Sequence, residues 1–498
     1  MKYRIRILSA LAPKGGEPNR KECKPVVRVT TRNLIVAVAA TLLLAVSALA
    51  QPDSEKVLYT FPGGRHGAVG ANQVIFDSAG NLYGTTLAGG NHSTICESFS
   101  GVPGCGIVFK LTPRAHGAWA ETVLYTFTGG SDGAGPLNGV VLDSAGNLYG
   151  TTLAGGDNSS CGFFGVPGCG VVFKLTPTAH GSWQETVLYT FTGGSDGGGP
   201  FAGVILDPRG NVYGSTYFGG DTTNCFVPSG CGVVFKLAPT ASGPWNESVL
   251  YTFGVSTGSF PTGGMTFDRR GNLYGATSFG GDPSVSCLGD PGCGAVFKLS
   301  PTSSGPWNET ILHAFTGGAD GGYLYAGVTL DSRGNVYGQA FYGGDLTASN
   351  CSGVGCGVVY KLTPASDGQW LDTVLHTFTA STDGAFGNGS VILDSSGNLY
   401  GTADVGGDLS APCNFFGETN VGCGVIFKLT PAGEGPWTES VLYAFTGGPD
   451  GSIPQSNLLL DSAGNIFGIT EAGGNTSECT GNGNGEAGCG VVFKLSAR

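Results

Sequence analysis

Charged residues are scarce in this chain: they make up 12% of its 498 residues, about half of the usual share. Beyond the first fifty positions, 15 basic residues stand against 34 acidic ones, which leaves a net charge of −19. Nucleic acids and anionic membranes require a positive protein surface. The charge balance therefore disfavours both as partners.

Only one long apolar run is present, from Leu34 to Ala50, after a segment with nine basic residues. At 17 residues it is short for a membrane span of about 20. It ends in Ala48-Leu49-Ala50, a small-x-small cleavage pattern. We therefore predict a signal peptide with a basic leader over residues 1–50, cleaved near Ala50/Gln51, and a secreted or periplasmic mature protein without membrane contact. An uncleaved anchor and a translation start downstream of Met1 are the alternatives.

Glycine is abundant, with 90 residues, and 26 prolines accompany it. Each glycine in a helix interior costs about 1 kcal/mol, so this density argues against helices. The hydrophobic content of 40% argues against disorder, and the glycines lack the three-residue period of collagen. The composition predicts a folded, turn-rich, all-β protein.

Seven repeats of 62–67 residues fill the rest of the chain, and they start near positions 57, 123, 187, 249, 311, 374 and 441. Each has an Asp-x-x-Gly-Asn pattern followed by an apolar residue and Tyr or Phe, then a cysteine pair and a strand such as Gly170–Thr176. The six tryptophans share one slot of the repeat, which indicates packing: Trp119, Trp183, Trp245, Trp307, Trp370 and Trp437.

Alternation and turn residues predict four antiparallel strands per repeat, at 139–143, 147–152, 170–176 and 183–191 in the second copy. Small four-stranded sheets repeated radially form a β-propeller. The last repeat stops after its third strand, whereas the mature chain begins with an unpaired fourth strand at Glu55–Phe61. We expect residues 51–498 to form a single seven-bladed propeller, closed when this N-terminal strand completes the last blade. A row of independent disulfide-linked domains is the alternative.

The copies resemble the GloVer (Gloeo/Verruco-type) tandem repeat of secreted bacterial proteins through segments such as Gly146–Gly150 and Gly168–Pro177. The resemblance covers Val57 to Leu495. It implies bacterial export and a repeat architecture, and it implies no established activity.

Fourteen cysteines fall in seven pairs, one in each repeat, and Cys23 lies in the leader. Their even number and the predicted export indicate local disulfides, whereas the variable spacing and the lack of a recurring histidine argue against a metal site. The predicted disulfides are Cys96–Cys105, Cys161–Cys169, Cys225–Cys231, Cys287–Cys293, Cys351–Cys356, Cys413–Cys423 and Cys479–Cys489.

In a propeller, the loops between the second and third strands share one face with the loops that lead to the next blade. We expect this face, which carries the cysteine loops, to bind ligands. It also collects a ring of aspartates: Asp132, Asp196, Asp320, Asp383 and Asp450 with Asp157, Asp221, Asp282, Asp345 and Asp408. These aspartates either bind Ca²⁺ or serve turns before glycine, and we favour turns because no loop supplies several ligands to one ion. We expect no other cofactor.

Aromatic residues between or near the cysteine pairs are ligand-binding candidates: Phe99, Phe163, Phe164, Phe226, Phe415 and Phe416. Rings on loops can stack on sugars or contact a protein with little loss of entropy. Plugging the bases of their loops is the alternative role, and the favoured one.

An enzyme would have to break the repeat symmetry. The position that holds Leu, Tyr, Ser or Phe in five repeats becomes Asp404 and Glu471 in the last two. This carboxyl pair is a weak candidate for acid/base catalysis, and two independent substitutions are the simpler explanation.

The sequence as a whole predicts an exported, non-catalytic binding module for an extracellular or periplasmic glycan or a surface protein. The alternatives are a polysaccharide hydrolase or lyase on the same scaffold, and a structural protein of the cell envelope.

Overall fold

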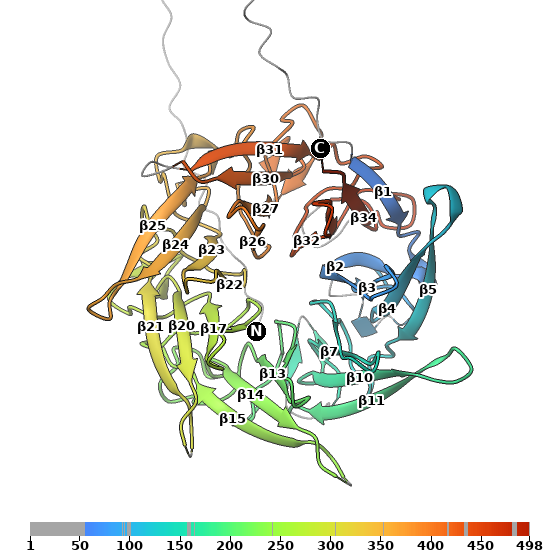
Figure 1. The fold of residues 1–498 in the computed structure, drawn as a ribbon, viewed down its shortest axis with the longest axis horizontal. Coiled ribbons are helices and arrows are strands. Elements are labelled where there is room, and N and C mark those ends of the chain that lie inside the picture. The colour runs from blue at the N-terminus through green and yellow to red at the C-terminus, as the bar shows by residue number, and fades with distance from the viewer. Residues whose placement is uncertain are drawn as a thin grey trace, which may run out of the picture. The chain divides into compact units, whose positions relative to one another are not determined.

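The computed structural model divides the chain into two units, Met1–Gln51 and Pro52–Arg498. The residues that it describes are 55–497, except 92, 94, 97–100, 157–160, 164, 242, 304, 352, 416–417, 433–436 and 481–485. The predicted signal peptide lies outside the described residues. The second unit contains seven four-stranded antiparallel sheets in a ring, which confirms the all-β, seven-bladed propeller (Figure 1).

Each blade runs from an inner strand a to an outer strand d. Blade 1 consists of β2 (Ala68–Phe76), β3 (Leu82–Ala88), β4 (Ile107–Pro113) and β5 (Trp119–Thr126). Blade 2 consists of β6 (Val141–Leu142), β7 (Leu148–Thr152), β10 (Val171–Pro177) and β11 (Trp183–Thr190). Blade 3 consists of β12 (Ile205–Leu206), β13 (Val212–Ser215), β14 (Val233–Ala238) and β15 (Asn246–Thr252). Blade 4 consists of β16 (Thr266–Phe267), β17 (Leu273–Thr277), β20 (Ala295–Ser300) and β21 (Asn308–Ala314). Blade 5 consists of β22 (Thr329–Leu330), β23 (Val336–Ala340), β24 (Val358–Pro364) and β25 (Trp370–Thr377). Blade 6 consists of β26 (Ile392–Leu393), β27 (Leu399–Ala403), β30 (Val425–Thr430) and β31 (Thr438–Ala444). Blade 7 consists of β32 (Leu459–Leu460), β33 (Ile466–Ile469), β34 (Val491–Leu495) and β1 (Glu55–Thr60).

Strand a is shorter than the sequence predicts in six blades, where it has two residues, although β2 has nine. Proline is one reason, because it cannot donate a ladder hydrogen bond. It precedes strand a in four of the short cases, at Pro136, Pro200, Pro261 and Pro454, whereas blade 1 has Gly70 in that slot.

Three loops between strands b and c contain small sheets where the sequence predicted loops alone. They are β8 (Gly162–Phe163) with β9 (Val166–Pro167), β18 (Ser286–Cys287) with β19 (Asp290–Pro291), and β28 (Asn414–Phe415) with β29 (Glu418–Thr419). Short 3₁₀ turns occur at Gly64–His66, Ala115–Gly117 and Ser349–Cys351.

The Asp-x-x-Gly-Asn motif forms the hairpin between strands a and b, as predicted. In blade 2, Asp143 Oδ1 accepts hydrogen bonds from the backbone N–H groups of Ala145 and Asn147 at 2.9 and 2.8 Å. Asp143 Oδ2 accepts two more, from the Asn147 amide at 2.7 Å and the Tyr149 hydroxyl at 3.1 Å. Burial alone would raise the pKa of Asp143, but these bonds lower it below its ordinary value. The carboxylate therefore organises the turn.

Seven hydrophobic clusters form the core. Six lie between two adjacent blades, and the cluster between blades 5 and 6 extends to Ile453 and Ala472 of blade 7. At every interface, a buried aromatic residue after strand d meets the aromatic ring of strand c in the next blade, as Phe127 meets Phe173 with 5.1 Å between centroids. The equivalent pairs are Phe61–Phe109, Phe191–Phe235, Phe253–Phe297, Phe315–Tyr360, Phe378–Phe427 and Phe445–Phe493. The core is thus made of blade interfaces.

The tryptophan slot also packs between blades, as predicted. Trp183 of blade 2 meets the edge of Tyr83 of blade 1 at 6.3 Å, and Lys110 lies over the Tyr83 ring at 5.4 Å. Equivalent Trp–Tyr contacts join Trp245 to Tyr149, Trp307 to Tyr213 and Trp437 to Tyr337.

The N-terminal strand closes the ring. β1 pairs antiparallel with β34, and Glu55 lies opposite Leu495. Phe61 is fully buried against Phe109 of blade 1. The predicted closure is therefore present, and Figure 1 shows β1 beside β34.

We expect Phe61→Ala to lower the free energy of unfolding by about 3–5 kcal/mol. Phe127→Ala is the matched substitution inside the ring and should cost a similar amount, because both rings fill equivalent interfaces. Urea unfolding followed by tyrosine and tryptophan fluorescence measures both. A nearly neutral Phe61→Ala beside a costly Phe127→Ala would contradict closure by β1.

Seven disulfides join the cysteine pairs named above, one in each blade. A glycine of the turn after strand d covers several of them. At Gly193, where φ is +75°, an added Cβ would lie 2.4 Å from Cys161 Sγ and 3.1 Å from Cys169 Sγ. The turn and the disulfide therefore pack too closely for a side chain.

Gly193→Ala should destabilise the protein by about 1–3 kcal/mol more than Gly181→Ala. Gly181 has nearly the same backbone angle, φ +79°, but nothing lies within 4 Å of its added Cβ. The pair separates steric contact with the disulfide from backbone strain. Equal losses in urea unfolding would show that backbone strain alone requires glycine.

Candidate functional site

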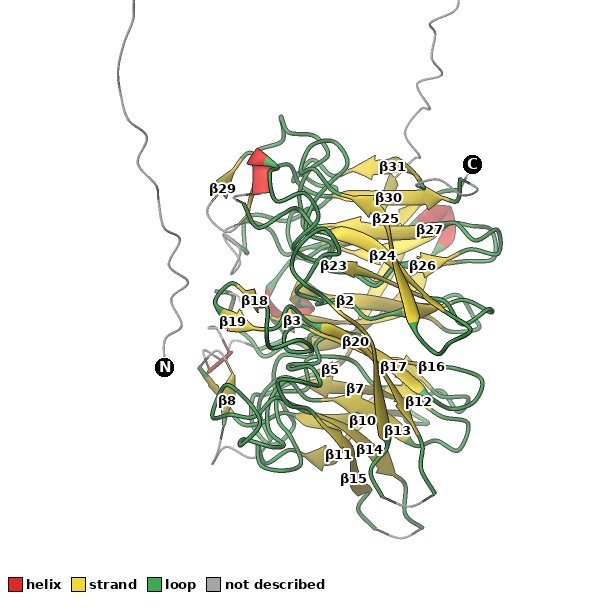
Figure 2. Cartoon of the chain, turned by 90° about the vertical axis from the view of Figure 1, so that its left-hand side faces the viewer, coloured by secondary structure: helices red, strands yellow, loops and turns green. Residues whose placement is uncertain are grey.

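The loops between strands b and c and the loops from strand d to the next blade form one surface, here called the disulfide face. They are hydrogen-bonded to each other, as from Gly156 N–H to Gly130 C=O and from Gly220 N–H to Gly194 C=O, both at 2.8 Å. Figure 2 shows the small sheets of these loops on one side of the ring.

Seven residues at or just after the end of strand b form what we call the axial ring: Leu87, Leu153, Tyr217, Ser278, Phe341, Asp404 and Glu471. In six of them, the backbone N–H donates to a carbonyl of the loop that enters the same blade, as from Tyr217 to Gly199 at 3.0 Å. These bonds fix the axial ring against the entering loops.

Thirteen aromatic rings in blades 2 to 6 form a continuous series of contacts, which we call the aromatic arc. Its members are Phe163, Phe201, Tyr217, Phe218, Phe226, Phe260, Phe279, Tyr323, Tyr325, Phe341, Tyr342, Phe386 and Phe415. Tyr217 stacks on Phe260 at 4.7 Å, and Phe279 meets Tyr323 at 4.4 Å. Nine of the thirteen keep part of their surface exposed, so the arc is both packed and accessible.

The predicted phenylalanines divide into three groups. Phe163 and Phe226 are half-buried members of the arc, at 5.7 Å from Tyr217 and 5.4 Å from Phe260. Phe415 is 4% exposed and stacks on Phe386, so its ring serves packing in this structure. The remaining candidates, Phe99, Phe164 and Phe416, lie outside the described residues.

Most of the arc was missed by sequence reasoning. Phe201, Phe260, Tyr323, Tyr325 and Phe386 occupy the loops that enter blades 3 to 6. The equivalent slots hold Gly, Val, Ile, Ala, Leu, Thr, Asn or Gln in other repeats. Departures from the repeat in these loops, rather than near the cysteines, were the available signal.

The structure brings the two acidic members of the axial ring together. Asp404 is 0% exposed. Its burial and then the charge of Glu471 raise its pKa well above the ordinary range, and amides of Gln455 and Asn388 oppose this. The Gln455 amide donates to Asp404 Oδ2 at 3.2 Å. Asp404 therefore holds its proton more tightly than an exposed aspartate does, and Glu471 is half-buried beside it.

The predicted ring of aspartates is occupied by turn hydrogen bonds. Asp132 accepts from the Thr128 N–H, the Thr128 hydroxyl and the Tyr125 hydroxyl. Asp221 accepts from the Thr223 N–H and hydroxyl. Within the described residues, no three or more His, Cys, Asp or Glu side chains gather as a metal would require. Asp157 lies outside that part.

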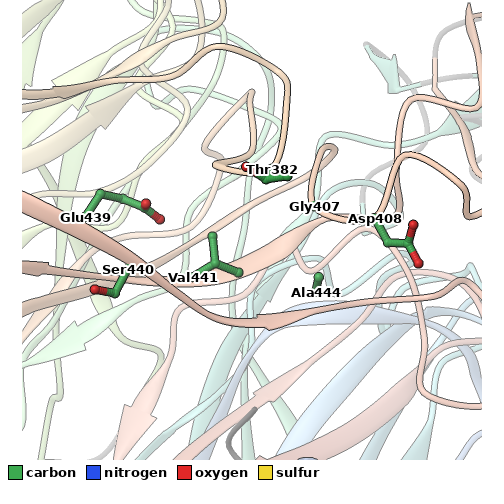
Figure 3. A pocket seen from close by; sticks show the side chains of 7 residues that line it. All are labelled: Thr382, Gly407, Asp408, Glu439, Ser440, Val441 and Ala444. Atoms are coloured by element: carbon green, nitrogen blue, oxygen red, sulfur yellow. The ribbon is translucent and has the colours of Figure 1, made fainter. Parts of the chain in front are cut away.

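Two shallow clefts lie away from the aromatic arc. The first, of about 470 Å³, is lined by Glu439, Ser440, Val441 and Ala444 of β31 and by Thr382, Gly407 and Asp408 of two loops (Figure 3). The second, of about 370 Å³, is lined by Pro62, Gly63, Gly64, Arg65, His66, Asn475, Ser477 and Glu478.

Strand d carries a carboxyl group at each blade interface: Glu55, Glu121, Glu185, Glu247, Glu309, Asp372 and Glu439. Each has one buried oxygen without a hydrogen bond. Burial, and then the charge of Asp132 on the preceding turn, raise the pKa of Glu185 to about 7. The same two causes act on Glu247 beside Asp196 and on Glu55 beside Asp450.

A family model decides the relationship of the chain. The model of the Gloeobacter/Verrucomicrobia repeat matches residues 94–351 and 285–498. The chain belongs to this family. The seven disulfides of this family member fit an extracellular or periplasmic protein. In the described part of the chain, we find no helix with the length and apolar character of a membrane span.

Solved structures similar to this Gloeobacter/Verrucomicrobia repeat protein are distant. A gluconolactonase-like protein is 14% identical, with 70% of this chain and 88% of that chain covered and a TM-score of 0.35. A luciferin-regenerating enzyme is 11% identical, with coverages of 72% and 90% and a TM-score of 0.37. A protein of unknown function from Dyadobacter fermentans is 11% identical, with coverages of 89% and 99% and a TM-score of 0.38. No curated protein matches the chain. These scores carry no argument about function.

The strand-d carboxyl groups predict a fall in stability as pH rises from 5 to 8. Their pKa is higher in the folded protein than in the unfolded chain, so their stabilising effect is complete below about pH 4.5 and is lost as pH passes 7. Glu185→Gln should add about 1 kcal/mol of stability at pH 8 relative to wild type and little at pH 5.

Urea unfolding at pH 5, 6.5 and 8 measures this dependence. Glu478→Gln is the control, because Glu478 is exposed and its substitution should leave the pH dependence unchanged. A Glu185→Gln variant whose stability follows the wild-type curve at every pH would show that the Glu185 carboxyl group does not titrate in this window.

Proposed function

We propose that the protein is an exported, non-catalytic binding module that recognises an extracellular or periplasmic glycan or surface protein through the disulfide face. The aromatic arc carries the proposal. Partly exposed Tyr and Phe side chains offer large contact areas at low entropic cost, and a continuous set of them far exceeds what a repeat needs to fold.

Export is supported by two observations of different kinds. The first fifty residues have the order of a signal peptide, with a basic segment, an apolar run and a small-x-small site. The disulfides require an oxidising compartment to form and persist. We propose cleavage near Ala50/Gln51 and release into the periplasm or medium.

Glycans are the favoured ligand class, because the arc combines partly exposed aromatic rings with the hydroxyl groups of its tyrosines. Exposed leucine and isoleucine side chains on the cysteine loops of the disulfide face favour a surface protein instead: Ile95, Leu288, Leu346 and Leu409 are 53%, 58%, 46% and 44% exposed. The net charge of the mature chain argues against nucleic acids and anionic membranes.

Hydrolysis or elimination of a polysaccharide is the second candidate function, and the meeting of Asp404 and Glu471 favours it. A general acid must reach the reacting oxygen, however, and Asp404 has no exposed surface. Binding without catalysis is therefore the better-supported function.

Pull-down on immobilised polysaccharides, with an assay for released reducing sugar, tests the proposal on the secreted protein. Wild type should be retained without sugar release, and the pair Phe163→Ala and Tyr217→Ala should weaken retention by about tenfold or more. The centroids of the two rings are 5.7 Å apart, so the double substitution removes two neighbouring aromatic side chains from the arc.

Leu371→Ala is the control, since this residue of β25 is 63% exposed and lies outside the arc. Its retention should equal that of wild type. Sugar release would favour the enzyme instead, and absence of retention on every polysaccharide would favour a protein partner or a structural role in the envelope.

A further inference from the structure

We propose that four exposed arginines on the side of the ring opposite the disulfide face form a binding site for an acidic polysaccharide. The hairpins between strands a and b and the loops between strands c and d make up this side, here called the hairpin face, because the connections of an antiparallel blade alternate between its two ends. Figure 2 shows β12 and β16, which lead into two of these hairpins, on the side away from β8 and β18. The site goes beyond the proposed function, which concerns the disulfide face.

The arginines occupy the turn of the Asp-x-x-Gly-Asn motif in three adjacent blades. They are Arg209 in blade 3, Arg269 and Arg270 in blade 4, and Arg333 in blade 5. At these two positions, the other four blades have serine followed by alanine or serine. The turn of the repeat is therefore uncharged at these positions, and three blades in a row depart from it in the same direction.

The hairpin does not need arginine in order to fold. In blade 3, the Arg209 N–H donates to Asp207 Oδ1 at 2.9 Å, and in blade 2 the Ala145 N–H donates to Asp143 Oδ1 at the same distance. Both bonds use the backbone, so the arginine side chain is not part of the turn. All four arginines are exposed, and within the described part of the chain none of them forms an ion pair. Their guanidinium groups are therefore available to a ligand.

Positive charge at these hairpins exceeds what the repeat itself balances. Every blade has one hairpin aspartate and one strand-c lysine. In blade 3, Lys236 lies over the Tyr213 ring at 5.7 Å, and the Tyr213 hydroxyl donates to Asp207 Oδ2 at 3.2 Å. The lysine and the aspartate cancel in charge, so the arginines are in excess. The loops between strands c and d of blades 3 and 4, residues 239–245 and 301–307, add no acidic residue.

This positive patch stands out in a chain whose net charge beyond the first fifty residues is −19. In the described loops of the disulfide face, Arg65 is the one arginine and lysine is absent. Charges farther away than about 10 Å are largely screened at 0.1 M salt. A ligand at the three hairpins therefore meets the arginines rather than the charge of the whole chain, and the hairpin face is the side that suits an anionic ligand.

Arginines on successive blades favour a polymer with an anionic group in each repeating unit. Guanidinium groups form paired hydrogen bonds with carboxylates and with tetrahedral oxyanions. A chain of uronate or sulfated sugars presents such groups along its length, whereas a single acidic sugar reaches one hairpin only. The hairpins of the other four blades carry an aspartate and no arginine, which favours a narrow chain over a flat anionic membrane. Such chains occur outside the cytoplasm, where we propose that the protein resides.

The test measures binding of the secreted protein to a polyuronate, a sulfated galactan, a neutral galactomannan and phosphatidylglycerol vesicles by isothermal titration. Wild type should bind at least one anionic polymer, and the affinity should fall about tenfold or more between about 50 and 200 mM salt because binding releases counterions. The quadruple variant Arg209→Ala, Arg269→Ser, Arg270→Ala and Arg333→Ala restores residues found in other blades. It should weaken binding of the anionic polymer about tenfold or more and leave binding of the galactomannan unchanged.

Arg114→Ala is the control for charge alone, because Arg114 is an exposed arginine in the loop between strands c and d of blade 1. It should change the affinity by less than about twofold, whereas Arg333→Ala should weaken binding about threefold. Ala145→Arg places an arginine on the adjacent hairpin of blade 2 and should tighten binding about threefold. Thermal unfolding of each variant identifies folding defects.

Equal affinity of wild type and the quadruple variant for both anionic polymers would overturn the site, and so would the absence of binding to either polymer by wild type. A loss in Arg114→Ala as large as that in Arg333→Ala would overturn its placement on the three hairpins. Tighter binding to the vesicles, lost in the quadruple variant, would overturn the polysaccharide as the ligand.

The Phe163→Ala and Tyr217→Ala pair separates this site from the proposed function. Both rings belong to the aromatic arc, so the pair should leave binding of the anionic polymers unchanged. A loss in this pair together with no loss in the quadruple variant would place the anionic polymer on the disulfide face and overturn the hairpin site alone.

Discussion

Burial of one blade against the next is the interaction on which the rest of the structure depends. A twisted four-stranded sheet leaves apolar side chains on both faces, and here all seven core clusters lie where the faces of neighbouring blades meet. The edge-to-face aromatic pairs repeat this contact with centroid distances such as 5.1 Å for Phe191 and Phe235. No blade has a core of its own, so the ring must close for every face to be covered.

The ring also separates structural from functional demands. Carboxylates such as Asp143 organise hairpins on one side, and glycines cover disulfides on the other. Because the hairpin carboxylates and the glycine–disulfide contacts hold the backbone of each loop, other side chains of the loops can vary between repeats. The aromatic arc and the polar residues of blades 6 and 7 occupy such variable positions.

The fold was predictable from the sequence because its signals are repeated seven times. A hairpin motif, a cysteine pair and a tryptophan slot each recur in register, and the orphan strand at Glu55–Phe61 reveals the closure. The pairing of Asp404 with Glu471 was also predictable, because equivalent positions in adjacent blades are neighbours. The small sheets of the cysteine loops were not, since two-residue strands carry no alternation.

The aromatic arc was not predictable for a different reason. Its rings come from two kinds of loop in five blades, and contacts such as Tyr217 with Phe260 join residues of different repeats. Sequence periodicity describes what the repeats share, whereas the arc consists of what distinguishes them. The curvature of the ring decides which of those differences become neighbours.

The pairing of β1 with β34 also sets the order in which the protein can fold. Strands within a blade meet over some tens of residues, but Glu55 must find Leu495 across almost the whole chain. Loop-closure entropy makes such long-range pairing slow. β1 therefore stays unpaired until β34 is available, and one edge of blade 7 and one face of blade 1 stay uncovered until the two strands meet. A truncated chain keeps this open strand edge and this apolar face exposed permanently. Its solubility therefore depends on the presence of both terminal strands.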